Sequence, residues 1–361
     1  MSSSWITRRY RPGDETKILE LLGLCFGQSV ASLEGWSWIL KRNPLGFHGT
    51  EGDIWVAETS AGLLIGHYER IRVPMWHAGK SIVGSQVSSL CTHPDYRRQG
   101  VYDSLARSAL EDAKKNEIGV SFSFPSELSY RGVVKHGWMD LGKMRDLAWV
   151  LDPEDFARRM RRTPVTKLFA SVLLSAAAPE LNGMRTGGGT GDVEIADGFM
   201  EDAGSVWDSL KHGYDVGIER TKAYLEWRYH RHWGDYQILS AMRGGQTAGY
   251  AVFRAAAPGS GRGRICELIS KNDDVHVYQR LLKEVRRRSR AQGMIVLAAS
   301  AACSPGHHAV LRHTRARILA SIMKSVRYDR GHMVALFLQG GQRVQPGRVR
   351  WYHSIGDRDF G

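Results

Sequence analysis

The chain contains few cysteines, and none of them are closely spaced. Its 361 residues include four, at Cys25, Cys91, Cys266 and Cys303. This pattern excludes a dense disulfide framework and a C-x-x-C redox or zinc motif. The first residues, MSSSWITRRY, do not resemble a signal peptide. We therefore expect a reduced, cytoplasmic protein.

Long apolar runs and metal-ligand spacings are also lacking. The longest apolar run, 168–178, is too short to cross a bilayer. The histidines show no H-x-x-x-H spacing, and we expect His307, His308 and His313 to lie on the surface. The sequence therefore predicts neither a transmembrane segment nor a metal site.

Acidic residues are outnumbered by basic ones. Lys and Arg total 50 against 37 Asp and Glu, which gives a formal net charge of +13. Such an excess favours anionic partners, among them coenzyme A, nucleotide sugars, acidic glycans, nucleic acid and membrane surfaces. No basic stripe is interleaved with aromatic residues, which disfavours nucleic acid. The segment 157–178 joins a basic piece, ARRMRRT, to the apolar run, and peripheral membrane contact there is an alternative to packing between domains.

The most informative stretch runs from Val87 to Leu110. It reads as an apolar strand, a Pro-Asp turn, a basic loop and a helix with one apolar side. The loop Arg97-Arg98-Gln99-Gly100 stands where the helix begins. Backbone N–H groups lack partners there and the helix dipole is positive, so this end favours an anion. The stretch predicts a phosphate-binding loop, although it has the pattern of neither a P-loop nor a Rossmann turn.

This pattern resembles the coenzyme A pyrophosphate loop of the GNAT acyltransferase superfamily, R-x-x-G-x-G/A at a helix start. Arg97 and Gly100 match it, whereas Tyr102 stands where the family normally has Gly or Ala. The resemblance covers residues 1–150 well and the rest more weakly. It implies an α/β (α+β) fold with a mixed, mostly antiparallel sheet flanked by helices. It also implies acetyl-CoA as the acyl donor and no metal.

The resemblance assigns nine residues to the coenzyme. The basic loop would hold the pyrophosphate, and the preceding strand end would pair with the pantetheine arm. A backbone N–H there, that of Cys91, would polarise the thioester carbonyl. In this family the amine attacks directly, so a covalent role for the Cys91 thiol is the less favoured alternative. The nine residues are Leu90, Cys91, Thr92, Arg97, Arg98, Gln99, Gly100, Val101 and Tyr102.

Candidate proton-transfer groups lie on either side of this stretch. His67 and Glu69 share one face of a predicted strand, and either is a candidate base, directly or through water. Many relatives place a tyrosine four residues before the Gly-Phe that opens the final hairpin, to protonate the leaving thiolate. Gly137-Trp138 resembles that dipeptide, but the tyrosine position holds Val133. Tyr130 is the substitute acid, with Ser129 as an alternative.

The order of predicted elements recurs after residue 193. The predicted hairpin at 54–73 returns at 236–254, and Trp38-Ile39-Leu40-Lys41 is echoed around Trp227. The counterpart of the phosphate loop, 270–274, has two carboxylates and no glycine, so we expect it to have lost coenzyme binding.

These observations predict two tandem GNAT-like domains. The first, 1–150, would bind coenzyme A. A helical and Gly-rich linker, 151–192, would follow, and a degenerate second domain, 193–361, would complete the acceptor cleft.

The expected function is that of an acetyl-CoA-dependent N-acetyltransferase acting on a small primary amine. The tail 351–359 resembles the end of tandem GNAT-like proteins among polysaccharide and amino-sugar enzymes. With the positive charge, it suggests an anionic amino sugar, either nucleotide-linked or a glycan precursor. One alternative is a tandem GNAT-like aminoacyl or peptidyl transferase, and another is a basic nucleic-acid-binding protein without catalysis. A cationic antibiotic amine would need an acidic cleft built from Asp273, Asp274 and the tail aspartates.

Overall fold

The computed structural model describes residues 4–27, 32–46, 52–144, 146–152, 155–156, 192–229, 234–257, 259–300, 331–339 and 349–358. Most of the expected linker, the apolar run 168–178, Cys303 and the histidines at 307, 308 and 313 lie outside these residues.

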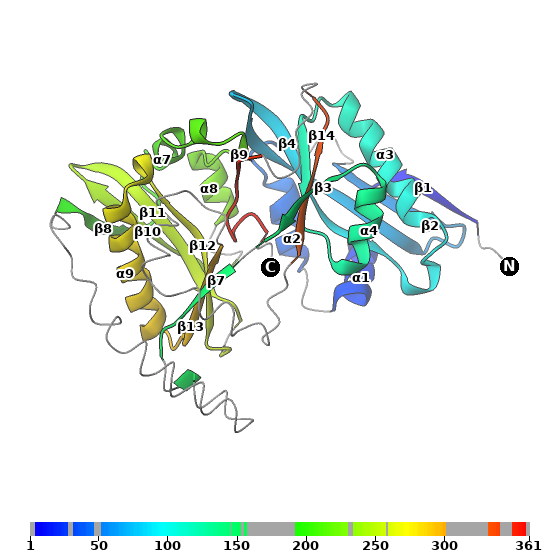
Figure 1. The fold of residues 1–361 in the computed structure, drawn as a ribbon. Helices are drawn as coiled ribbons and strands as arrows, with labels where there is room; N and C mark the ends of the chain where they lie inside the picture. Colours follow the sequence, from blue (N-terminus) through cyan, green and yellow to red (C-terminus); the bar gives the residue numbers. More distant parts are fainter. Residues whose placement is uncertain are drawn as a thin grey trace.

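Two mixed sheets stand side by side, each flanked by helices (Figure 1). The first sheet has the order β1-β2-β3-β4-β5-β14-β6, and β9 and β15 extend it beside β3. The second has the order β7-β13-β12-β11-β10-β8. The pairs β4–β5, β12–β13 and β9–β15 are parallel and the other pairs are antiparallel. The predicted fold class is therefore confirmed.

The strands of the first sheet are β1 (Trp5–Arg9), β2 (Ile54–Thr59), β3 (Leu64–His77), β4 (Lys80–Thr92), β5 (Val120–Ser123), β6 (Met139–Lys143), β9 (Val216–Ile218), β14 (His332–Phe337) and β15 (Trp351–Tyr352). Those of the second are β7 (Asp146–Val150), β8 (Glu194–Asp197), β10 (Gln237–Arg243), β11 (Gln246–Ala255), β12 (Arg262–Ser270) and β13 (Val296–Ser300).

Helices cover both faces of the first sheet. Apolar residues of α1 (Glu15–Phe26) and α2 (Leu33–Lys41) pack on one face, and those of α3 (Val101–Lys115) pack on the other with α4 (Glu127–Lys135). The second unit carries α7 (Gly204–Asp208), α8 (Lys222–Arg228) and α9 (Val275–Ala291). The sequence analysis did not identify α2 as a helix. Trp36 within it is buried, as expected for a core residue.

Four strands lie in the sheet of the other half of the chain: β9, β14 and β15 join the first sheet, and β7 joins the second. β6 and β7 are neighbours in sequence, yet they do not form the expected final hairpin. β6 pairs with β14, which comes from the end of the chain and inserts between β5 and β6. β7 crosses to the second sheet and pairs with β13 (Figure 1). The strands therefore cross the expected boundary at residue 150, and each sheet needs a strand from the other half of the chain.

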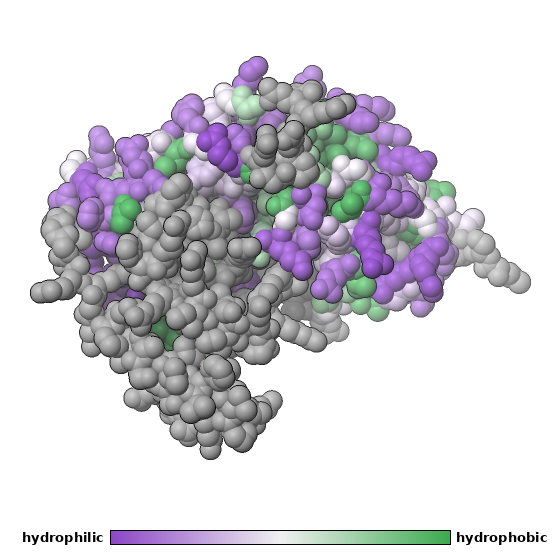
Figure 2. Space-filling model, in the orientation of Figure 1, coloured by the Kyte–Doolittle hydropathy of each residue, from purple (hydrophilic) through white to green (hydrophobic). Residues whose placement is uncertain are grey.

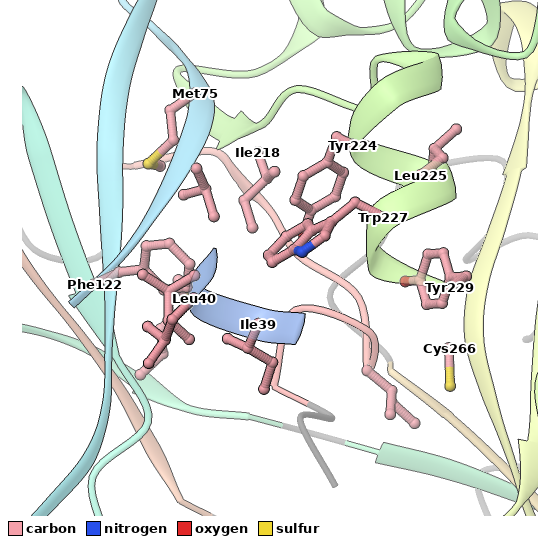
Figure 3. Close-up of a cluster of buried hydrophobic side chains, with 14 of the residues drawn as sticks. Ile39, Leu40, Met75, Phe122, Ile218, Tyr224, Leu225, Trp227, Tyr229 and Cys266 are labelled. Carbon is pink, nitrogen blue, oxygen red and sulfur yellow. The ribbon is translucent and has the colours of Figure 1, made fainter. Parts of the chain in front are cut away.

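One hydrophobic core joins the two units. It runs from Ile39 and Leu40 of α2 to Tyr224 and Leu225 of α8. Figure 3 shows Tyr224 and Trp227 pointing from α8 towards α2. At its centre, the Trp38 indole N–H donates to the Trp227 carbonyl over 3.0 Å, and the Trp227 indole donates back to the Trp38 carbonyl over 3.2 Å. The two echoed segments thus meet through a reciprocal pair of hydrogen bonds.

The described part of the face in Figure 2 is mostly hydrophilic, and its hydrophobic residues form small separate groups. Within the described ranges, no helix has the length and hydropathy needed to span a bilayer.

Candidate functional site

The strand β4 separates from its neighbour β5 halfway along its length. The two pair only from Gly84 to Val87, although β4 continues to Thr92. A bulge begins at this point, because Ser89 and Leu90 together face the single residue Tyr68 of β3. Ser89 adopts a positive φ of 48°, which is uncommon for a residue with a side chain. The bulge turns the last residues of β4 away from β5 and leaves that backbone edge open to a ligand.

The predicted phosphate loop connects this strand to α3. A short 3₁₀ turn, Pro94–Tyr96, comes first, and the loop then passes through left-handed conformations at Arg98 (φ 62°) and Gly100 (φ 80°). No side chain caps the start of α3, so its first N–H groups remain available to an anion. Arg97, Arg98 and Gln99 are exposed around it. The loop therefore has the geometry and charge of a phosphate site.

The start of α3 lies tightly against the sheet and against α4. A Cβ at Gly66 would lie 2.5 Å from Val101, so only glycine permits this approach. Tyr102 occupies the position where the sequence pattern normally has a small residue. Its ring packs against Gly132 of α4 and lies 5.2 Å from the His136 ring. The bulky side chain thus fills the space between α3 and α4.

His67 and Glu69 form a buried pair on the face of the sheet covered by α1 and α2. His67 Nδ1 donates to the Ser89 carbonyl over 2.8 Å, so in the neutral ring the other nitrogen, Nε2, is an acceptor. Nε2 lies 3.7 Å from Glu69 Oε2, and neither atom has a hydrogen-bond partner. Their side chains are only 0% and 4% exposed. Two buried acceptors face each other with no donor between them, which suits proton acceptance from a bound group.

Tyr130 belongs to a different cluster, on the face covered by α3 and α4. Its hydroxyl donates to Asp140 Oδ2 over 2.7 Å, and His332 Nδ1 lies 3.0 Å from the same oxygen. The hydrogen bond to Asp140 raises the pKa of Tyr130. Burial on its own would raise the pKa of Asp140. The hydrogen bonds that Asp140 accepts outweigh this effect, and its pKa is lowered. The structure therefore brings His67 and Glu69 together and places Tyr130 with Asp140 and His332 instead.

Two thiols meet beside the end of β4. Cys25, on the last turn of α1, has its Sγ 3.6 Å from the Thr92 carbonyl oxygen and contacts the Cys91 thiol. That contact, together with the charge of Arg97, lowers the pKa of Cys25 to about 7 against the opposing effect of burial. Contact with Cys25, and then burial, raise the pKa of Cys91.

The second unit has a closed counterpart of the phosphate loop. There Asp274 caps α9, because its side chain accepts from the N–H groups of His276 and Val277. Arg243 pairs with the same carboxylate at 2.8 Å. Asp357 is buried against Arg220 at 2.8 Å, so Asp274 and Asp357 do not form an acidic cleft. The described residues contain no group of three or more His, Cys, Asp and Glu arranged for a metal.

Sequence reasoning missed Cys25, Asp140 and His332. Nothing in the local sequence marks them, since His332 lies 192 residues from Asp140 along the chain. In the sequence Cys25 stands out only as one of four scattered cysteines, and its contact with Cys91 depends on how α1 packs against β4.

Comparison with known proteins identifies the domain that carries this site. A family model described as an acetyltransferase (GNAT) domain matches residues 7–139. No curated protein matches the chain.

Three solved structures illustrate the similarity in fold. A GCN5-related N-acetyltransferase from Kribbella flavida aligns with a TM-score of 0.55 and 14% identity, over 84% of this chain and 65% of its own length. One from Anabaena variabilis gives 0.58 and 11%, over 93% and 73%. N-myristoyltransferase from Saccharomyces cerevisiae, solved with myristoyl-CoA, gives 0.58 and 12%, over 96% and 81%. Residues 7–139 therefore match an acetyltransferase (GNAT) domain, and the chain shares its fold with GCN5-related N-acetyltransferases.

Proposed function

We propose that the chain is an acetyl-CoA-dependent N-acetyltransferase with one coenzyme site. The uncapped start of α3, with two arginines and a left-handed Gly100 beside it, would hold the pyrophosphate. The open edge of β4 from Leu90 to Thr92 would pair with the pantetheine arm. A backbone N–H of this edge would stabilise the developing oxyanion. The Cys91 N–H, expected in this role from the sequence, is directed towards His67 of β3 instead.

The pair His67 and Glu69 would accept the proton of the attacking amine, and its geometry carries the proposal. The two bare acceptor atoms are held 3.7 Å apart in a buried site. An ammonium ion cannot attack a thioester, so a group that takes up its proton is required. Tyr130, held by Asp140, would return a proton to the leaving thiolate.

The acceptor would be a small primary amine, and the net charge of +13 supports an anionic one such as a nucleotide-linked amino sugar or a glycan precursor. A related fold holds myristoyl-CoA in the yeast enzyme, so donors of several chain lengths belong in the test. An aminoacyl transferase without coenzyme would have no use for the open helix start, and this observation disfavours it.

The proposal is tested by a coenzyme A release screen over free and nucleotide-linked amino sugars, with acetyl-CoA as the first donor. With an accepted amine in hand, Glu69→Gln is expected to lower kcat by roughly 10²–10⁴-fold, as is typical for loss of a general base. Acetyl-CoA affinity should be retained. Glu111→Gln, on the exposed side of α3, is the matched control and should behave as wild type. A Glu69→Gln variant with unchanged kcat would rule out this base.

A further inference from the structure

Cys25 lies beside the open end of β4, the edge that the proposed function assigns to the pantetheine arm. It reaches from α1 to the Thr92 carbonyl over 3.6 Å, at the open end of β4. Cys91, which it contacts, pairs across the strands with His67. The unpartnered acceptor atoms of His67 and Glu69 lie on this same face. Buried acceptors without donors indicate that a polar ligand group completes this part of the site.

The surroundings of Cys25 are those of a reactive thiol. Reactive cysteines are partly exposed and have a lowered pKa in a positive environment. Cys25 is half-buried and near Arg97, and the Cys91 thiol donates towards its sulfur. Contact with Cys25, and then burial, raise the pKa of Cys91, so its protonated form is favoured. The two thiols therefore differ: the Cys25 thiol, which donates to the Thr92 carbonyl, is the one that loses its proton more readily.

We propose that Cys25 is an acyl-modification site: in the absence of an amine, its sulfur takes the acyl group from coenzyme A bound in the same chain. This inference rests on the proposed function, because it requires the coenzyme to be held at the loop from Arg97 to Tyr102.

The reaction is a thioester exchange and needs no further reagent. The Cys25 thiol first loses its proton to water. Its thiolate sulfur then bonds to the acyl carbon, and the bond from that carbon to the coenzyme sulfur breaks. Coenzyme A leaves as a thiolate and takes up one proton. One thioester replaces another, so the free energy of the exchange is close to zero. The oxyanion of the tetrahedral intermediate would be stabilised by the same backbone N–H as in amine transfer.

The test measures covalent acyl incorporation into the intact protein with acetyl-CoA alone. We expect one acetyl group per chain by mass spectrometry, mapped to Cys25 and released by neutral hydroxylamine, which cleaves thioesters but not amides. Cys25→Ser should lose the adduct. Cys91→Ser should still be acylated at Cys25, but more slowly near pH 7, because contact with Cys91 lowers the pKa of Cys25. The rate should rise with pH through about 7, the pKa of Cys25 set by Cys91 and Arg97.

A truncated donor, S-acetyl-N-acetylcysteamine, lacks the pyrophosphate and should acylate Cys25 far more slowly at equal concentration. An equal rate with this donor, an adduct that persists in Cys25→Ser, or an adduct on Cys91 or lysines would overturn the inference.

A thermal shift with acetyl-CoA, run in parallel, separates this inference from the proposed function. A clear shift without any adduct overturns the Cys25 assignment alone. The absence of both shift and adduct overturns the proposed coenzyme site and the acylation with it.

Discussion

At the residue scale, the site depends on details of backbone geometry that side-chain spacing does not reveal. Alternation along β3 correctly predicted that His67 and Glu69 share a face. The Ser89 carbonyl accepts a hydrogen bond from His67 Nδ1. In the neutral ring this leaves Nε2 without a proton, so that Nε2 and the Glu69 carboxylate are two acceptors that face each other. That carbonyl is positioned by a bulge with a positive φ at a serine, and no residue in the sequence signals it.

The buried residue His353 predicts how the stability of the protein depends on pH. Burial lowers the pKa of His353 to about 4, whereas an unfolded histidine titrates near 6.5. Between these values the unfolded state binds a proton that the folded state does not, so the free energy of unfolding falls as the pH falls through this window. Between pH 7 and pH 5, the free energy of unfolding measured by urea denaturation should fall by about 2 kcal/mol less in His353→Gln than in wild type.

His276→Gln is the control for this measurement. His276 is exposed on the first turn of α9, so its removal should leave the pH dependence unchanged. If His353→Gln and wild type lose the same free energy over this pH range, His353 does not titrate as inferred.

At the scale of elements, the sequence predicted most strands and helices but not where every strand pairs. The local pattern of 332–337 and 146–150 does not indicate which sheet each segment joins. The insertion of β14 between β5 and β6, and the pairing of β7 with β13, are decided by long-range packing. The sequence predicted a phosphate-binding loop before α3 and the loss of this function before α9. The structure adds that α3 has no side-chain cap, whereas Asp274 caps α9.

The exchange of β14 predicts a large effect of a substitution far from the coenzyme loop. Val334 is fully buried between β5 and β6. Val334→Asp places an unpaired charge there, opposite Asp140, and should lower the free energy of unfolding by about 3–5 kcal/mol. Ile6→Asp, on the outer strand β1 where the side chain is 63% exposed, should change it by less than about 0.5 kcal/mol. Similar losses in both variants would argue against a structural role for the inserted strand.

At the scale of the whole molecule, the two units behave as one folded body. They share a core, exchange strands and meet through the Trp38 and Trp227 hydrogen bonds. Among the described residues, three arginines (Arg70, Arg220 and Arg228) are buried together with six carboxylates. Burial therefore removes no net positive charge from the surface.

A shared core predicts a single cooperative unfolding transition. The calorimetric and van't Hoff enthalpies should agree for the full chain. Trp227→Ala should keep one transition while lowering the free energy of unfolding by about 3–5 kcal/mol, as is usual for loss of a large buried aromatic residue. Two resolved transitions in the wild-type protein would show that the units fold separately.

The central claim is that this molecule has one coenzyme A site, at the start of α3. Calorimetric titration with acetyl-CoA tests it most directly. We predict one molecule bound per chain, loss of binding in the Arg97→Glu, Gly100→Glu double variant, and wild-type binding in Arg107→Glu, which adds negative charge on the exposed side of the same helix. No binding to the wild-type protein, two molecules per chain, or binding that survives the double variant would contradict the account.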